Sequence, residues 1–375
     1  MKNISYWSPI LSNIATLKAV INSAESLSRY SNKYNVTLLN TVGEFQKSKP
    51  KNINVKIHDL NHNLLNRKLP GTGFLKTRLS MIYIFMKCFF PLKKYLEKEK
   101  PDFIIIHLLT SLPLLLFLIF NFKTKCILRI SGLPKMNLIR LFFWKLCSKK
   151  IFRITCPTNL TKNYLIKYNF IEKEKIVTLF DPILNVKEAN LLKKENVKEK
   201  NFYFSAGRLT KQKNFNFLVK AFSNIKKRHI QNKKLLIAGD GELKNEISKN
   251  ILKNENHDIH LLGFEKNVFK YMNNSDAFIL SSLWEDPGFV IIEAAFCRSI
   301  IISSDCENGP KEFINDDCGI LFKSNDLIDF IIQFEKFMNA NQDQIKKIRL
   351  NALKKTRKFT IFSHFINLNK ILLNI

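Results

Sequence analysis

Two glutamates eight residues apart, Glu285 and Glu293, stand within the stretch WEDPGFVIIEAA and are the first candidates for chemistry. Glu285 precedes an Asp-Pro-Gly turn, whereas Glu293 lies in the apolar run behind that turn. Pro287 favours the first turn of a helix, and Gly288 lets another group come close to the backbone. We therefore expect a buried helix from Phe289 onward, with its free N–H groups directed toward Glu285.

A helix start of this kind binds anions or hydroxyl oxygens, because its first N–H groups have no partner within the helix. Glu285 can accept hydrogen bonds from hydroxyl groups beside those donors. The combination suits a sugar that carries a phosphate. The same stretch equally fits a capping acid followed by a solvated glutamate, so the surrounding sequence has to decide between the two interpretations.

Alternating strands and helices would position these residues. Strands are expected at residues 3–7, 36–40, 54–57, 103–107, 125–130, 151–156 and 175–179 of the first half, and at residues 202–206, 234–238, 259–262, 277–280 and 300–303 of the second. Helical stretches separate most of them. This order predicts the α/β class, with two Rossmann-like doubly wound domains that face a cleft and bind ligands at the carboxyl ends of their strands.

The composition of the chain suggests where these domains begin and end. The first domain is expected at residues 1–185 and the second at residues 201–355, with the polar, lysine-rich stretch 186–200 as a linker. A final helix over residues 356–375 is expected to pack back on the first domain.

Five successive strand ends of the second half carry glycines, acids or bases. In SAGRLTKQKNF, Arg208 and Lys213 are two cations beside Gly207 and suit a diphosphate, although a solvated basic turn is common in so lysine-rich a chain. The other four loops contain AGDGE, LLGF, EDPGFVIIEAA and SSDCENGPKEF. Each loop alone is a weak signal, but their regular recurrence favours a cleft for a phosphate-bearing sugar.

Taken together, the sequence resembles the retaining glycosyltransferases of family 4 (group 1), which have the two-domain GT-B fold. GRLTKQKN, AGDGE, LLGF, SSLWEDPGFVIIEAA and SSDCENGPKEFI occur in the order and spacing of that family, and Glu285 and Glu293 form its Glu-x(7)-Glu pair. The resemblance is strong over residues 201–322 and weaker over residues 1–200, where PDFIIIH and RISGLPK carry it. It implies that the first domain binds the acceptor and the second a nucleoside diphosphate sugar.

The resemblance assigns roles to the matching positions. Arg208 and Lys213 would hold the donor diphosphate and the charge that develops on the leaving group. Glu285 would bind hydroxyls of the transferred sugar, and Glu293 the ribose hydroxyls of the nucleotide. Further donor contacts would come from Gly207, from Gly263 and Phe264 near the base, and from the backbone at Gly288, Phe289 and Val290.

The first half contributes one expected site residue, His107, which ends the strand of PDFIIIH and matches a family histidine that faces the donor sugar. A structural histidine is the ordinary alternative. The loop after the first strand, SPILSN, lacks the glycine pair of the family, so its Ser and Asn side chains would serve the acceptor. EDPGF replaces the commoner EGFG form. Because no Asp-x-Asp occurs, we expect metal-independent transfer with no cofactor besides the donor.

The net charge of +30 is uneven, with +23 in residues 1–200 and +7 in residues 201–375. A basic first half indicates an anionic partner, or the base composition of an AT-rich genome. The stretches 73–96 and 138–153 mix Lys and Arg with apolar residues, and would lie on an anionic membrane or turn their apolar sides to the core. We expect a cytoplasmic protein, peripheral on the inner face of the cell membrane, that extends a lipid-linked or polysaccharide acceptor in lipopolysaccharide, O-antigen or capsule assembly.

Other classes of protein fit less well. The uncharged segment 103–122 imitates a membrane span, but Pro113 and polar residues at its centre favour a strand, a loop and a helix. The seven cysteines form no CxxC pair and indicate reduced thiols. A nucleotide-sugar epimerase of similar fold is the nearer alternative. A nucleic-acid-binding protein would alternate basic and aromatic residues along one surface, whereas the charge here is diffuse, so we expect no nucleic-acid partner.

Overall fold

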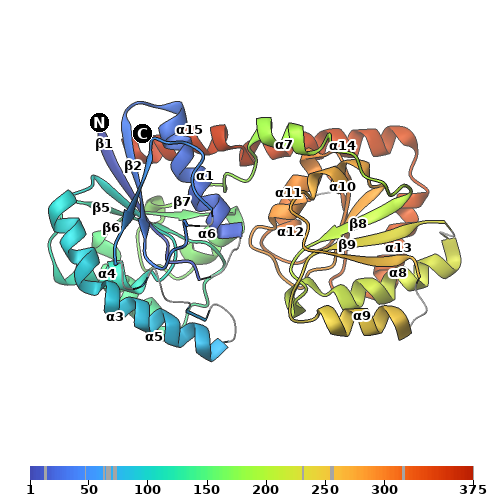
Figure 1. Ribbon diagram of the computed structural model, residues 1–375, viewed down its shortest axis with the longest axis horizontal. Helices are drawn as coiled ribbons and strands as arrows, with labels where there is room; N and C mark the ends of the chain where they lie inside the picture. Colours follow the sequence, from blue (N-terminus) through green and yellow to red (C-terminus); the bar gives the residue numbers. More distant parts are fainter. Residues whose placement is uncertain are drawn as a thin grey trace. The chain divides into compact units, whose positions relative to one another are not determined.

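The protein contains two α/β units. The computed structural model describes residues 1–11, 15–46, 48–61, 64, 69–70, 74–229, 232–253, 257–314 and 317–374. One unit comprises Met1–Ile183 together with Ile361–Ile375, and the other comprises Leu184–Thr360. Each unit is built on one parallel sheet with helices packed against it (Figure 1). The predicted α/β class with two doubly wound sheets is confirmed.

The first unit has a seven-stranded sheet of order β3-β2-β1-β4-β5-β6-β7. Its strands are β1 (Lys2–Trp7), β2 (Tyr34–Asn40), β3 (Val55–Asp59), β4 (Phe103–Ile106), β5 (Lys125–Arg129), β6 (Ile151–Cys156) and β7 (Ile176–Thr178). The centre of the sheet is covered on both faces, so β4 is a continuous apolar run in which all four residues are buried. The strand order reverses between β1 and β4, and a doubly wound sheet binds ligands beyond such a point.

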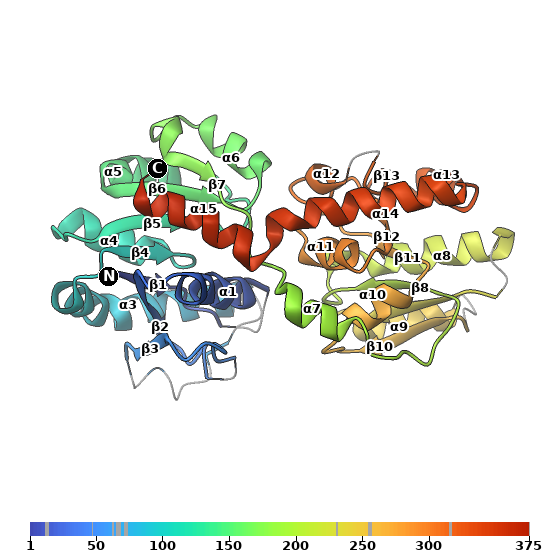
Figure 2. The same ribbon diagram turned by 90° about the horizontal axis from the view of Figure 1, so that it is seen from above.

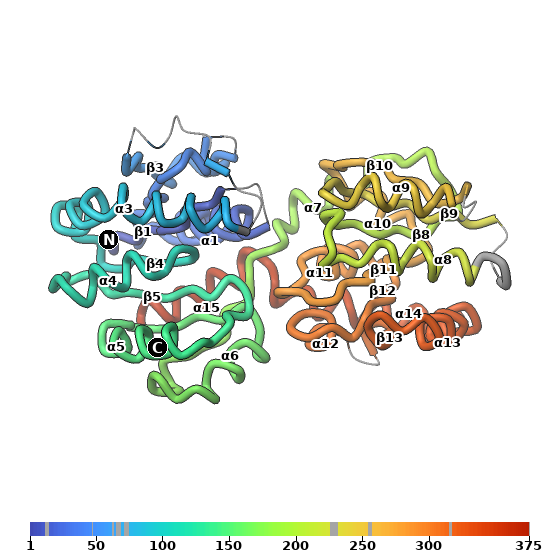
Figure 3. Tube along the Cα trace, turned by 90° about the horizontal axis from the view of Figure 1, so that it is seen from below, coloured from blue at the N-terminus to red at the C-terminus, as the bar shows by residue number. Residues whose placement is uncertain are grey.

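The helices of the first unit are α1 (Ala15–Tyr30), α3 (Phe74–Glu99), α4 (Ser111–Ile119), α5 (Leu138–Cys147), α6 (Asn159–Ile166) and α15 (Ile361–Leu373). Helices α3, α4 and α5 lie side by side in that order (Figure 3). The uncharged segment 103–122 forms β4, a loop and α4, as the sequence predicted. Within the part of the chain that the structure describes, no helix is long and apolar enough to cross a membrane.

The last helix of the chain, α15, packs along α1 in the first unit (Figure 2). His364 is buried between them, with Nε2 2.8 Å from Ser23 Oγ and Nδ1 2.7 Å from the carbonyl oxygen of Phe180. Burial lowers the pKa of His364 to about 3, so its ring is neutral at pH 7. Tyr34 adds a hydrogen bond from its hydroxyl to Asn369 of the same helix.

The second unit has a six-stranded sheet of order β10-β9-β8-β11-β12-β13. Its strands are β8 (Phe202–Ala206), β9 (Lys234–Ala238), β10 (Ile259–Gly263), β11 (Ala277–Leu280), β12 (Ile300–Ser304) and β13 (Ile320–Phe322). Its helices are α7 (Val186–Leu192), α8 (Phe215–His229), α9 (Lys244–Lys253), α10 (Phe269–Asn274), α11 (Phe289–Phe296), α12 (Pro310–Phe313), α13 (Leu327–Met338) and α14 (Gln342–Thr356). Here the strand order reverses between β8 and β11.

Two expectations about connecting segments were wrong. The stretch 186–200 is not wholly a linker, because α7 forms at its start, where the Asn185 side chain caps the helix by accepting from the N–H of Glu188. The chain end is not one helix from residue 356, because the short 3₁₀ turn Arg357–Phe359 separates α14 from α15. Residues 12–14 and 71–73, which fall within predicted elements or loops, lie outside the described residues.

The strand-end loops of the second sheet pack backbone against backbone. Gly239 follows β9 with φ +151°, and a Cβ on it would lie 1.8 Å from the carbonyl oxygen of Gly207. The N–H of Gly239 donates to the carbonyl of Gly263 at 2.7 Å, which joins the ends of β9 and β10. A side chain at Gly239 would therefore push apart the loops that carry the candidate site.

We predict that Gly239→Ala lowers the free energy of unfolding by more than about 2 kcal/mol. The energetic cost of the strained backbone conformation and that of the clash with the Gly207 backbone add up. Gly263→Ala is the matched control. It also has a positive φ, of +75°, but among the described residues nothing lies within 4 Å of its Cβ position, so it should cost about 1 kcal/mol. Urea unfolding measures both, and equal losses would show that the contact with Gly207 is unimportant.

Candidate active site

A lysine and a glutamate meet where the strand order of the second sheet reverses. Lys213 ends the short 3₁₀ turn Lys211–Lys213 after β8, and Glu285 follows β11. Lys213 Nζ forms an ion pair with Glu285 Oε1, and the two side chains are only 13% and 6% exposed. Because water barely reaches the pair, each charge depends on the other for its stabilisation.

Hydrogen bonds between the same two loops fix the ion pair. The carbonyl of Gln212 accepts from the N–H of Leu283, and the Gln212 side-chain amide donates to the carbonyl of Trp284, both at 2.8 Å. Ser282 Oγ donates to Glu285 Oε1 at 2.5 Å, so the carboxylate also has a partner from its own loop. The two charged side chains thus stand on a backbone that is itself held together.

Helix α11 begins beside Glu285, as the sequence predicted. Its N-cap is Gly288 with φ 82°, no side chain caps it, and its first turn contains no acidic residue. The N–H groups of its first residues have no acceptor within the helix and favour an anion. Pro287 lies before the N-cap and not in the first turn, where the sequence had predicted it. Glu293 is one turn further along α11 and is buried.

The other expected donor residues lie on the same edge of the sheet. A Cβ on Gly207 would lie 3.1 Å from Lys213 Cε, so the absence of a side chain lets the lysine cross the turn. Arg208 is exposed. Gly263 ends β10, two strands from β8, and Phe264 next to it is 76% exposed. An exposed aromatic ring offers a stacking surface for a planar base.

His107 is the one expected site residue in the first unit. It follows β4, its N–H donates to the carbonyl of Trp7 at 2.9 Å, and its ring stacks on Tyr6. Its pKa lies well below the ordinary histidine value because the ring is buried, and the positive charge of Arg129 adds to the effect. The ring is therefore neutral at pH 7. The structure thus places Lys213, Glu285 and the start of α11 together, and His107 at the corresponding edge of the first sheet.

Sequence reasoning missed Arg129, which ends β5 and forms a buried ion pair with Asp181. The arginine stood within the motif RISGLPK, but its partner is 52 residues away and no local pattern links them. It also missed Asn308, whose side-chain amide donates to Asp286 at 2.5 Å and ties the loop after β12 to the start of α11.

The second unit matches a known family. Residues 186–358, nearly the whole unit, match the model of the family described as glycosyl transferases group 1. The second unit of this chain is therefore similar to the group 1 glycosyltransferases over nearly its whole length. The match supports the predicted glycosyltransferase class, whereas the number 4 of the family stays a prediction.

Several relatives are similar in sequence. A glycosyltransferase of Methanocaldococcus jannaschii, MJ1059, is 37% identical over 39% of this chain and 35% of its own length. The amylovoran biosynthesis glycosyltransferase AmsD of Erwinia amylovora is 28% identical over 66% of this chain and 71% of its own. The UDP-Gal:alpha-D-GlcNAc-diphosphoundecaprenol alpha-1,3-galactosyltransferase of Escherichia coli is 28% identical, over 66% and 68%. The matches thus span from about a third to just over two thirds of these relatives.

Solved structures share the whole fold. HepE of Anabaena, crystallised with UDP, has a TM-score of 0.75 at 14% identity, over 100% of both chains. The sucrose-phosphate synthase of Thermosynechococcus elongatus has a TM-score of 0.76 at 15% identity, over 100% of this chain and 99% of that one. At such identities the likeness concerns the fold alone, and it confirms the predicted GT-B architecture.

We predict that Lys213→Met lowers the free energy of unfolding by about 3 kcal/mol at pH 7, because it leaves the buried Glu285 carboxylate without its cation. Adding Glu285→Gln to this variant should restore about half of the loss or more, since no buried charge then remains unpaired. Chemical denaturation of the wild type, both single variants and the double variant measures this. A double variant that is less stable than Lys213→Met would contradict the role of the ion pair.

Proposed function

We propose that this chain transfers a sugar from a nucleoside diphosphate sugar to a lipid-linked acceptor, with retention at the anomeric carbon and without a metal ion. One observation carries the donor half: Lys213 and Glu285 pair at a nearly buried strand end, beside a helix start that lacks acidic residues. A cation and N–H donors for a diphosphate thus stand next to a carboxylate for sugar hydroxyls.

The chemistry follows from that arrangement. Breaking a sugar–diphosphate bond leaves positive character on the sugar and negative charge on the departing phosphate. Lys213, Arg208 and the N–H groups of α11 would stabilise the phosphate charge from fixed positions, which are worth more in a site that excludes water. Lys213 would then be shared between the phosphate and Glu285, and Glu285 would orient the transferred sugar.

The nucleotide would extend from α11 toward β10. Glu293, one turn into α11, would accept hydrogen bonds from the ribose hydroxyls, and the open face of Phe264 would meet the base beside Gly263. UDP is the first nucleotide to test, because the structure of HepE contains it.

The acceptor half of the proposal draws on relatives. The name of the E. coli relative specifies a diphosphoundecaprenol-linked sugar as its acceptor, and that of AmsD specifies the biosynthesis of amylovoran. We propose that this chain likewise extends a lipid-carried oligosaccharide during the assembly of a surface polysaccharide. Such an acceptor is held at a membrane, so the enzyme must work at that surface.

Two helices of the first unit expose the side chains that such a surface would bind. On α3, five large apolar side chains 56–74% exposed recur every three or four residues and form one stripe: Leu75, Leu79, Ile82, Met86 and Phe90. On α5, four more are 49–84% exposed: Leu138, Ile139, Phe142 and Leu146. We call these nine residues the apolar surface. Exposed apolar groups on this scale usually mark an interaction site.

The positive charge around the apolar surface favours an anionic membrane as the binding partner of that surface. No Asp or Glu occurs from residue 60 to residue 96 or from residue 103 to residue 171, and these stretches hold 7 and 11 Lys or Arg. Basic residues near an anionic leaflet contribute about 1 kcal/mol each. We therefore propose that the first unit binds peripherally to the inner face of the cell membrane through α3 and α5.

Calorimetric titration with UDP, GDP and ADP tests the donor half, and failure of a folded sample to bind any of them would refute it. We predict that Glu293→Gln weakens binding of the selected nucleotide roughly tenfold, because a neutral amide accepts ribose hydrogen bonds less well. Glu285→Gln should leave this affinity within about threefold but lower kcat roughly a hundredfold, because its carboxylate serves the transferred sugar. Full activity of Glu285→Gln would contradict its assignment.

We predict that the double variant Ile82→Ser/Phe90→Ser lowers binding to anionic vesicles more than tenfold, since each burial contributes roughly 1.5 kcal/mol or more. The matched control, Leu252→Ser/Ile328→Ser, removes two apolar side chains of the second unit that are 75% and 73% exposed, against 74% for Phe90 and 56% for Ile82, and should not change binding. Vesicle flotation measures both.

A charge variant separates the two contributions to membrane binding. Lys94 is exposed, whereas Lys93 pairs with Glu97 at 2.9 Å, so Lys94→Glu alters the free charge more than Lys93→Glu does. Flotation of Lys94→Glu should fall at low salt and approach that of the wild type at high salt. Equal flotation of the wild type with neutral and anionic vesicles, or none with either, would contradict the membrane proposal.

A further inference from the structure

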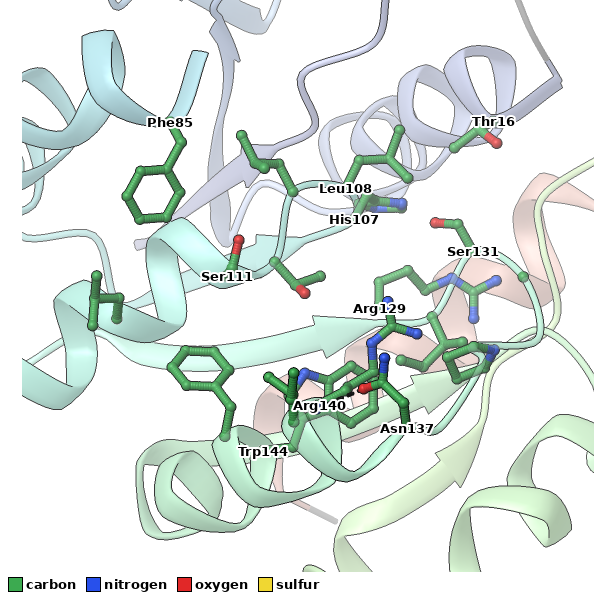
Figure 4. Close-up of a pocket in the computed structure, with 18 residues that line it drawn as sticks. Thr16, Phe85, His107, Leu108, Ser111, Arg129, Ser131, Asn137, Arg140 and Trp144 are labelled. Atoms are coloured by element: carbon green, nitrogen blue, oxygen red, sulfur yellow. Dashed lines mark hydrogen bonds between the residues drawn. The ribbon is translucent and has the colours of Figure 1, made fainter. Parts of the chain in front are cut away.

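The first unit contains a pocket of about 850 Å³ that the donor chemistry does not use. It lies among α3, α4, α5 and the loops after β4 and β5, and all the residues that line it belong to the first unit (Figure 4). A volume of this size is typical of ligand sites. Its two ends differ in chemistry, and that difference identifies what it would hold.

One end of the pocket is polar and leaves buried groups without partners. Arg129 Nη1, His107 Nε2 and Ser131 Oγ are buried, and none has a hydrogen-bond partner among the described residues. Arg129 is only 3% exposed and is held from behind by Asp181. Buried polar groups are nearly always hydrogen-bonded, and the residues that carry these three atoms all line the pocket, so a polar ligand there would supply the missing partners.

The N-termini of two helices make the polar end of the pocket favourable for an anion. Thr110 and Ser111 at the beginning of α4 line the pocket, as do Asn137 and Arg140 at the beginning of α5. Neither helix has an acidic residue in its first turn. Helix N-termini and arginines favour anions, and none of the described residues that line the pocket is an Asp or Glu that would compete for them. The polar end therefore suits a phosphate or a diphosphate.

The other end of the pocket is apolar. Its lining includes Phe85 from α3, Leu115 from α4, and Ile139 and Phe143 from α5. Figure 4 shows Phe85 on the side away from Arg129, Ser131 and Asn137. Ile139 is 81% exposed and belongs also to the apolar surface, so the apolar wall continues outward onto the side chains that would meet the membrane.

We infer that this pocket binds the junction between hydrocarbon and phosphate in the lipid-linked acceptor. The inference rests on the proposed function and specifies its acceptor site. The phosphate groups lie against Arg129, Arg140 and the starts of α4 and α5, and the first part of the chain lies between Phe85, Leu115 and Phe143. The rest of the chain leaves past Ile139 into the bilayer, while the sugar end lies near His107.

Calorimetry on the full chain tests this with farnesyl diphosphate, farnesol and inorganic diphosphate as probes. Farnesyl diphosphate should bind at least tenfold more tightly than either part alone, because only it fills both ends. Leu115→Trp, which fills the apolar end, should weaken its binding at least tenfold. Leu118→Trp is the matched control: it lies one turn away on α4, is 38% exposed and does not line the pocket, so binding should be unchanged.

Arg140→Gln tests the polar end without disturbing the buried Arg129–Asp181 pair. This variant should weaken the binding of farnesyl diphosphate at least fivefold and leave the binding of farnesol unchanged. If farnesol or inorganic diphosphate alone binds as tightly as farnesyl diphosphate, or if Leu115→Trp has no effect, the inference is wrong. If dihexanoyl phosphatidylglycerol binds as tightly, the pocket is a phospholipid site and the acceptor assignment fails. Nucleotide titration of the same samples tells this failure apart from failure of the donor proposal.

Discussion

The nearly buried ion pair between Lys213 and Glu285 is the contact on which the candidate donor site depends. It joins loops that are 72 residues apart in sequence, at the point where the strand order of the second sheet reverses. Since neither charge can be left alone without a large cost, the loops after β8 and β11 must keep their positions. The hydrogen bond from Asn308 to Asp286 carries the same constraint to the loop after β12. Together these two contacts order three strand ends around the start of α11.

The first unit has a different distribution of charge. Its buried ion pair, Arg129 with Asp181, leaves one guanidinium nitrogen unpaired among the described residues, and Arg129 lines a pocket whose described lining contains no acid. The long acid-free stretches of sequence keep the neighbouring helices cationic. A neutralised ion pair in the second unit and a positive pocket in the first agree with the proposed reaction. The nucleotide must leave after each transfer, whereas a lipid-linked acceptor must be drawn from an anionic membrane surface.

The sequence predicted the sheets well, because strands covered on both faces are continuous apolar runs such as FIII in β4. It also predicted that Lys213, Glu285 and Gly288 lie at strand ends, since each stands in a motif that follows an apolar strand. It could not predict which faces of α3 stay exposed. That helix is apolar nearly all round, burying Ile84, Cys88 and Leu92 while exposing Leu79 and Phe90, so periodicity alone left both interpretations open.

Long-range polar contacts likewise could not be predicted from the sequence. Nothing local connects Arg129 to Asp181, or His364 of the last helix to Ser23 of the first. Such pairs form only once the sheet and its returning helix are assembled, and they decide which buried groups are satisfied and which are left for a ligand. The pocket of the first unit could therefore be recognised only in the folded structure and not in the sequence.

A crystal structure of the chain with its preferred nucleoside diphosphate tests the central claim most directly. The account predicts that the diphosphate lies within hydrogen-bond distance of Lys213 Nζ and of the first N–H groups of α11, with the ribose hydroxyls on the Glu293 carboxylate. A nucleotide bound elsewhere, or bound without contact to Lys213 and α11, would contradict it.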